Sequence, residues 1–275
     1  MFLSTLLVDT GANPDRPRPG RLWLRNLYRV HQRLCMAFPS ARRKDTDRDF
    51  LRPYTPADFP EDRSDTSESP ASPSDAPRHV HVRRSDQSGF LFRVDPLPGG
   101  RAVILVLSAL EPDWNYAFRN AGYLLVGPPA VRPYRPEVVA GQRFRFRLRV
   151  NAVFRAREAS KHPSGEPIDK KWAGKRIGVP GDQEALRNWL DRRAQAAGFV
   201  VQKLIAAQAG YAYVSNSKGG TTNQHLRSVC YDGILEVADV EAFRQALVRG
   251  IGPAKAFGFG LLSIAPLGEE PRDAL

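Results

Sequence analysis

Tyr28 and His31 are two side chains whose types and spacing suggest chemistry. They lie in LYRVHQRLCMAF, where Leu27, Val30 and Leu34 recur at helical spacing. Residues three apart project from neighbouring turns of one side of a helix, so the segment predicts a phenol and an imidazole together. An imidazole with a pKa near about 6.5 can accept or donate a proton at neutral pH. On this pattern alone, a histidine or tyrosine beside an apolar stripe is more often structural than catalytic.

A second candidate is the glycine-rich stretch RGIGPAKAFGFGLLSIAP, residues 249–266, which carries Lys255. Glycine permits positive φ and a close approach of another molecule, and successive backbone N–H groups beside a lysine form a good concavity for phosphate. The stretch matches neither GxxxxGK[ST] nor the strand and helix setting of GxGxxG. A tight turn before a last buried strand is the alternative. The candidate glycines are Gly250, Gly252, Gly258 and Gly260.

Composition favours a polyanionic partner. The 275 residues include 41 Lys+Arg against 29 Asp+Glu, a net charge of +12. We find no apolar run near about 18 residues, and MFLSTLLV lacks the basic flank of a signal peptide, so we expect a cytoplasmic protein without a membrane partner. Cys35 and Cys230 form no CxxC pair, which favours reduced thiols over a disulfide or zinc site. We expect no metal and no other cofactor.

In the first half, the helix from about Asn26 to Phe38 follows an expected strand at 1–9 and a turn-rich connection at 11–20. Residues from about 41 to 88 are rich in Pro, Ser and Asp, which predicts a mobile insertion. After it we expect strands at 89–96 and 101–110, a short helix at 115–122 and a strand at 123–127.

In the second half, GQRFRFRLRVNAVFRAR at 141–157 alternates basic and apolar residues, as a strand with one packed face does. A helix at 182–198, capped by Asp182, strands at 200–214 and 225–237, a helix at 239–250 and a strand at 260–267 follow. Both halves therefore read β-α-β-β-α-β. The order predicts an α+β fold of two tandem ferredoxin-like (βαββαβ) domains, at residues 1–132 and 133–275.

Jointly, these segments resemble the CRISPR repeat-cleaving endoribonucleases of the CasE type, which are subunits of the Cascade surveillance complex. The resemblance rests on MFLSTLLV, LYRVHQRLCMAFP, RFRLRVNAVF, GKRIGVP, RSVCYDGILEV and RGIGPAKAFGFGLLSIAPL, and it covers nearly the whole chain outside residues 41–88. It implies tandem ferredoxin-like domains, metal-independent cleavage of a repeat hairpin in precursor RNA, and other Cascade subunits as partners.

The resemblance places the active site at Tyr28 and His31. Some relatives carry a lysine about five residues after that histidine, where this chain has Met36. Lys255, Arg25 and Arg33 remain open as the supporting cation. We expect the 2′-hydroxyl to attack the scissile phosphate, giving a 2′,3′-cyclic phosphate and a 5′-hydroxyl. The alternative is a hairpin-binding subunit that does not cut.

RNA binding should be largely electrostatic, since the base edges of A-form RNA lie in a deep, narrow groove. We expect the arginine row on the strand within 141–157, the basic segment after it, the turn at 215–222 and the glycine stretch to contact the RNA. The predicted contacts are Arg143, Arg145, Arg147, Arg149, Lys170, Lys171, Lys175, Arg176, Lys218, Gly250, Gly252, Lys255, Gly258 and Gly260.

Overall fold

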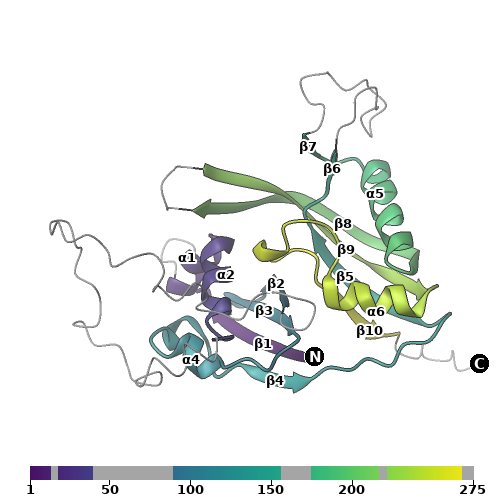
Figure 1. Ribbon diagram of the computed structural model, residues 1–275. Coiled ribbons are helices and arrows are strands. Elements are labelled where there is room, and N and C mark those ends of the chain that lie inside the picture. Colours follow the sequence, from purple (N-terminus) through teal and green to yellow (C-terminus); the bar gives the residue numbers. More distant parts are fainter. Residues whose placement is uncertain (14–17, 40–88, 156–174, 217–221, 268–275) are drawn as a thin grey trace, which may run out of the picture.

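The computed structural model describes residues 1–13, 18–39, 89–155, 175–216 and 222–267 (Figure 1). The predicted insertion at 41–88 and the predicted RNA contacts Lys170, Lys171 and Lys218 lie outside these residues. The described part is an α+β fold with two four-stranded antiparallel sheets and one small two-stranded sheet.

The first unit is a ferredoxin-like βαββαβ domain whose sheet has the order β2-β3-β1-β4. Val30 and Leu34 of its main helix pack with Leu6 and Val8 of the first strand in one buried cluster. Its elements are β1 (Phe2–Asp9), α1 (Pro19–Leu24), α2 (Leu27–Cys35), β2 (Phe90–Leu97), β3 (Arg101–Ser108), α4 (Trp114–Phe118), the 3-10 helix η2 (Gly122–Leu124) and β4 (Ala130–Pro133).

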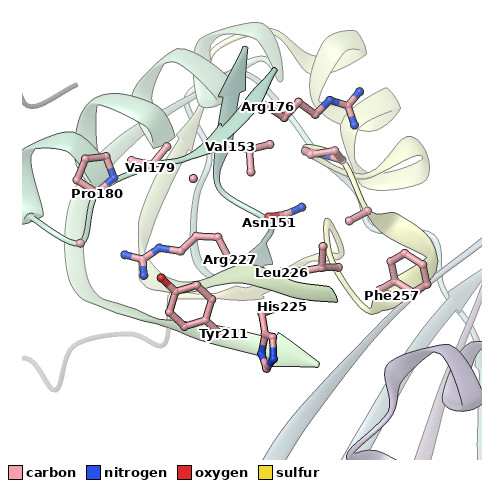
Figure 2. A pocket seen from close by; sticks show the side chains of 14 residues that line it. Asn151, Val153, Arg176, Val179, Pro180, Tyr211, His225, Leu226, Arg227 and Phe257 are labelled. Carbon is pink, nitrogen blue, oxygen red and sulfur yellow. The ribbon is translucent and has the colours of Figure 1, made fainter. Parts of the chain in front are cut away.

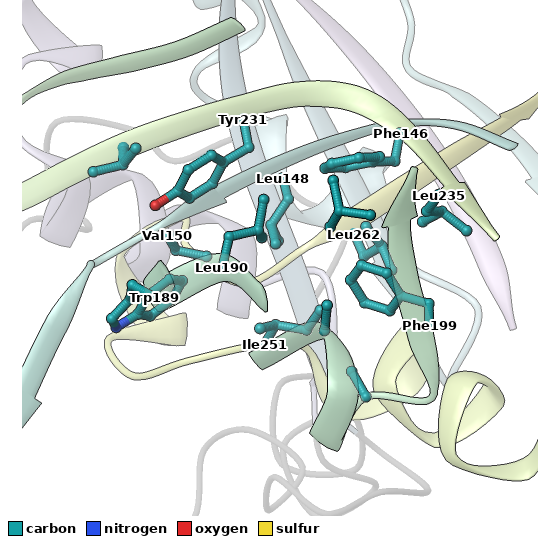
Figure 3. Packing of buried hydrophobic residues seen from close by; sticks show 14 of the residues in the cluster. Phe146, Leu148, Val150, Trp189, Leu190, Phe199, Tyr231, Leu235, Ile251 and Leu262 are labelled. Atoms are coloured by element: carbon teal, nitrogen blue, oxygen red, sulfur yellow. The ribbon is translucent and has the colours of Figure 1, made fainter. Parts of the chain in front are cut away.

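The second unit repeats the pattern, with the sheet order β10-β5-β9-β8. Trp189 stacks on Tyr231 at 6.3 Å between ring centroids, inside a large core formed by helices and sheet (Figure 3). Its elements are β5 (Arg143–Val150), β6 (Val153–Arg155), β7 (Arg176–Gly178), α5 (Gln183–Ala196), β8 (Phe199–Asn216), β9 (Thr222–Val237), α6 (Val240–Arg249), the 3-10 helix η4 (Lys255–Phe257) and β10 (Leu262–Pro266). The predicted tandem ferredoxin-like fold is confirmed.

Local predictions around the fourth strand were wrong. Residues 123–127 form the end of η2 and a single bridge from Leu125 to Val8, whereas the fourth strand is β4. β4 lies at the sheet edge beside β1, a place where its last residue, Pro133, is tolerated. The connection predicted at 11–20 also contains the start of α1, which has Pro19 in its first turn.

The connection between the two sheets runs from 134 to 142. Because β4 ends at Pro133 and β5 begins at Arg143, we propose that the domain boundary lies within this connection, next to the predicted division at 132/133.

Candidate functional site

The helix α2 contacts both halves of the chain. Its start is fixed by Asn26, whose Oδ1 accepts the Tyr28 backbone N–H at 3.1 Å. Leu27 is buried in a separate cluster with Ala212 of β8 and with Phe259, which follows η4. Figure 1 shows the β8–β9 hairpin extending from the second sheet toward α1 and α2. The amino-terminal helix therefore meets two carboxyl-terminal elements.

His31 lies half-buried on α2 against the strand β2. Its ring stacks on Phe90 at 5.6 Å and on Phe92 at 6.4 Å between centroids. The Cys35 sulfur, one helical turn further on, lies 3.5 Å from His31 Nε2 and 3.9 Å from Nδ1. These contacts restrict the orientation of the imidazole, and the residue as a whole remains partly exposed.

Tyr28 faces the carboxyl-terminal loop. Its ring lies 6.5 Å from the Phe257 ring, in a tilted arrangement, and Ala254 packs in the same cluster. The loop that carries Lys255 is thereby in contact with the helix that carries Tyr28 and His31, residues more than 200 positions away in sequence. The sequence predicted these two segments separately, and the structure places them together.

The glycines shape this loop. All four predicted glycines have positive φ, between 72° and 87°. A Cβ on Gly250 would lie 2.8 Å from Leu91, and one on Gly258 would lie 3.0 Å from Phe92, so the loop packs closely on β2. Gly258 and Gly260 are buried, and the Gly260 N–H donates to the Arg149 carbonyl at 2.7 Å. Close packing thus explains why glycine occupies positions 258 and 260. Gly252, by contrast, is half-buried.

The arginine row is largely paired within the protein. Arg143 Nε binds Glu236 at 3.0 Å, and Arg147 makes two hydrogen bonds to Asp232, which raise the pKa of the guanidinium. Both carboxylates come from the neighbouring strand β9, in direct register. Arg145 is exposed.

Arg149 lies at the contact between the two domains. Its Nη1 donates to the Val94 carbonyl at 3.1 Å and its Nε to Ser228 Oγ at 2.9 Å. Its guanidinium lies 5.8 Å from the Phe259 ring centroid, and burial lowers its pKa. The structure therefore gives Arg149 a role in holding the loop and the sheets together.

The other predicted cations fall in different places. Arg33 Nη1 donates to the Ala117 carbonyl at 3.0 Å and to Asn120 Oδ1 at 3.2 Å, so its charge lies on the α4 side. Met36 packs against the first domain's core. Lys175 and Arg25 are exposed.

Arg176 lines a groove of about 770 Å³ between β7, the β8–β9 hairpin and the loop (Figure 2). Tyr211, Arg227 and Asn151 also line it, and the sequence reading assigned none of them a role. The sequence pattern that could have indicated this groove is YAY at 211–213 in β8 opposite HLR at 225–227 in β9. This pairing places aromatic and basic side chains opposite each other. Phe257 belongs to both this groove and the contact with α2.

Comparisons with known proteins decide the family. The family described as "CRISPR associated protein" matches residues 70–266. The CRISPR-associated endoribonuclease Cse3 of Thermus thermophilus is 34% identical over 189 residues, which are 64% of this chain and 79% of the relative. The chain belongs to the CasE family of CRISPR-associated proteins. Another relative in this CasE family, the Cascade subunit CasE of Escherichia coli, is 29% identical over 268 residues, 97% of this chain and 100% of the relative.

Solved structures share the fold across nearly the whole chain. A structure of Cse3 bound to a 19-nucleotide RNA has a TM-score of 0.61 at 28% identity and covers 97% of this chain and 100% of that one. Thermus thermophilus Cse3 bound to an RNA that represents a pre-cleavage complex has a TM-score of 0.59 at 26% identity, over 96% and 99% of the two chains. No helix in the described part is long and apolar enough to cross a membrane.

Proposed function

We propose that this protein is an endoribonuclease that cleaves CRISPR precursor RNA at its repeat hairpin and stays with the mature guide RNA as a subunit of Cascade. The observation that carries the proposal is the contact between α2, with Tyr28 and His31, and the loop that carries Lys255. The family supports it, because one relative is named an endoribonuclease and another a Cascade subunit.

The proposed reaction needs no metal. The 2′-oxygen of one nucleotide forms a bond to the phosphorus, and the bond from the phosphorus to the 5′-oxygen breaks. His31 takes the proton from the 2′-hydroxyl or delivers one to the 5′-oxygen, since an imidazole can do either at neutral pH. The products are a 2′,3′-cyclic phosphate and a 5′-hydroxyl.

Tyr28 and Lys255 are the proposed supporting residues. The Tyr28 hydroxyl is suited to hydrogen-bond the phosphate, and a lysine stabilises the negative charge that develops on it. Among the cations considered from the sequence, we favour Lys255 because its 3-10 helix packs on α2. Arg33 instead binds the Ala117 carbonyl of α4 and the Asn120 side chain in the turn after α4.

The direct test uses a repeat-hairpin RNA in excess EDTA, with analysis of the product ends. We expect cleavage in EDTA, and no cleavage when the nucleotide that supplies the 2′-hydroxyl is replaced by its 2′-deoxy form. Loss of activity in EDTA would replace the proposal with a metal nuclease. Tight binding of the hairpin without any cleavage would favour the non-catalytic RNA-binding subunit.

A further inference from the structure

The groove beside the catalytic helix has features that hairpin cleavage does not explain. It lies between the small β6–β7 sheet, the β8–β9 hairpin and the carboxyl-terminal loop (Figure 2). Its volume of about 770 Å³ is within the range of small-ligand sites. The polar and aromatic side chains that line it are Asn151, Arg176, Tyr211, His225, Arg227 and Phe257.

The β8–β9 hairpin has two different faces. On one face, Ala212 and Val214 are buried in the cluster that includes Leu27 of α2. On the other face, Tyr211 pairs in register with Arg227, whose guanidinium lies 5.4 Å from the ring centroid. Tyr211 is nevertheless 68% exposed. A large aromatic ring that is fixed by a cation on one side and open on the other is suited to stack a base.

Two buried polar atoms on residues that line this groove have no hydrogen-bond partner in the part of the chain that the structure describes. The Asn151 side-chain oxygen and the Arg227 Nε have no hydrogen-bond partner among the described residues. Asn151 is only 7% exposed. Buried polar atoms without partners are rare in native proteins, and each has a cost that a bound ligand removes. The groove therefore has one unpaired acceptor and one unpaired cationic donor within its wall, next to one exposed aromatic ring.

We propose that this groove binds an unpaired nucleotide that flanks the RNA hairpin; this inference rests on the proposed function. The base stacks on Tyr211, a base N–H group donates to the Asn151 oxygen, and a phosphate or base oxygen accepts from Arg227. A paired base keeps its faces within the helix, so only an unstacked nucleotide presents a face and an edge together.

The groove is adjacent to the catalytic helix. Phe257 lines the groove and also contacts the Tyr28 ring at 6.5 Å. A nucleotide held here would fix the strand that leaves the hairpin relative to α2. The groove thereby contributes to the choice of the bond that is cut.

The test compares two RNAs, a repeat hairpin with unpaired nucleotides on both sides and the same hairpin without them. The parent protein should bind the first about tenfold more tightly, as expected for one base stacked on an aromatic ring. Tyr211→Ala should remove this difference without changing the affinity for the bare hairpin, and Tyr211→Phe should retain it. Asn151→Leu, which removes the unpaired acceptor, should also reduce the difference.

Tyr123→Ala is the matched control, because Tyr123 is 69% exposed and lies on η2 in the first domain. It should bind both RNAs as the parent does. A photo-crosslink from 4-thiouridine at the unpaired positions should map to the peptide around Tyr211 or Arg227.

Equal affinity of the parent for the two RNAs, together with normal cleavage, would overturn the subsite and leave the proposed function intact. Failure of the parent to bind either RNA would overturn both. A difference that survives Tyr211→Ala would place the unpaired nucleotide elsewhere and refute the assignment.

Discussion

Asp95→Asn should destabilise the protein strongly, because Asp95 neutralises an arginine that joins the two domains. Arg93 Nε donates to both Asp95 oxygens, at 2.9 and 2.8 Å. Its Nη1 crosses to the second sheet, donating to Ser263 Oγ at 2.7 Å and to the Arg147 carbonyl at 3.2 Å. The side chains of Arg93 and Asp95 are only 5% and 12% exposed.

The magnitude follows from this burial. Asparagine keeps the shape of aspartate but removes its charge, so the buried guanidinium loses its counter-ion. Breaking a buried pair by removing one partner costs about 3–5 kcal/mol. For a chain of this size, about 3 kcal/mol corresponds to a fall in melting temperature of roughly 6–12 °C.

The assay is urea and thermal unfolding followed by circular dichroism, with Glu236→Gln as the control. Glu236 pairs with Arg143 on the surface, where the two side chains are 32% and 59% exposed, so its loss should cost at most about 1 kcal/mol. If the free energies of unfolding of the two variants differ by less than about 1 kcal/mol, the reasoning that Arg93 links the domains through a buried charge is refuted.

Three further predictions concern the loop, its contact with α2 and a thiol. Gly250→Ala should lower the melting temperature more than Gly252→Ala. Both glycines have positive φ, but an added Cβ would lie within 3 Å of a β2 side chain and a loop carbonyl only at Gly250. Equal falls in melting temperature would contradict this packing. Phe257→Ala should slow single-turnover cleavage by roughly tenfold with little change in binding of the bare hairpin, because it removes the ring against Tyr28; an unchanged rate would show that the contact is dispensable. Burial raises the pKa of the Cys230 thiol, so little thiolate exists at pH 8. Mass spectrometry should therefore show slow modification of Cys230 by iodoacetamide, at a rate that increases as the pH rises. Modification at the rate of a free cysteine would contradict the burial.

The tandem fold could be predicted from the sequence because the residue patterns that mark its helices and strands are local. The alternation of Arg143 to Val150 marked β5, and Asp182, the predicted cap, accepts a hydrogen bond from the Ala185 N–H in the first turn of α5. The fourth strand was misplaced because the stability of β4 comes from its pairing with β1, which no local pattern reveals.

The candidate site was readable only in part. Tyr28 and His31 stood out through their spacing and the family resemblance, and their roles stay predictions. The arginine row looked like an open basic surface because the sequence does not give the register with β9, which brings Asp232 and Glu236 beside Arg147 and Arg143. The groove was missed because it combines residues from distant segments.

The central claim is that the helix α2 carries the catalytic imidazole. Its most direct test is the single-turnover cleavage rate of His31→Ala on a labelled repeat hairpin, with the bound fraction measured in the same reactions and with Gln32→Ala, an exposed neighbour on α2, as the control. We predict a rate at least about 100-fold below the parent for His31→Ala, with binding retained and with Gln32→Ala unchanged. Cleavage by His31→Ala at the parent rate would contradict the account.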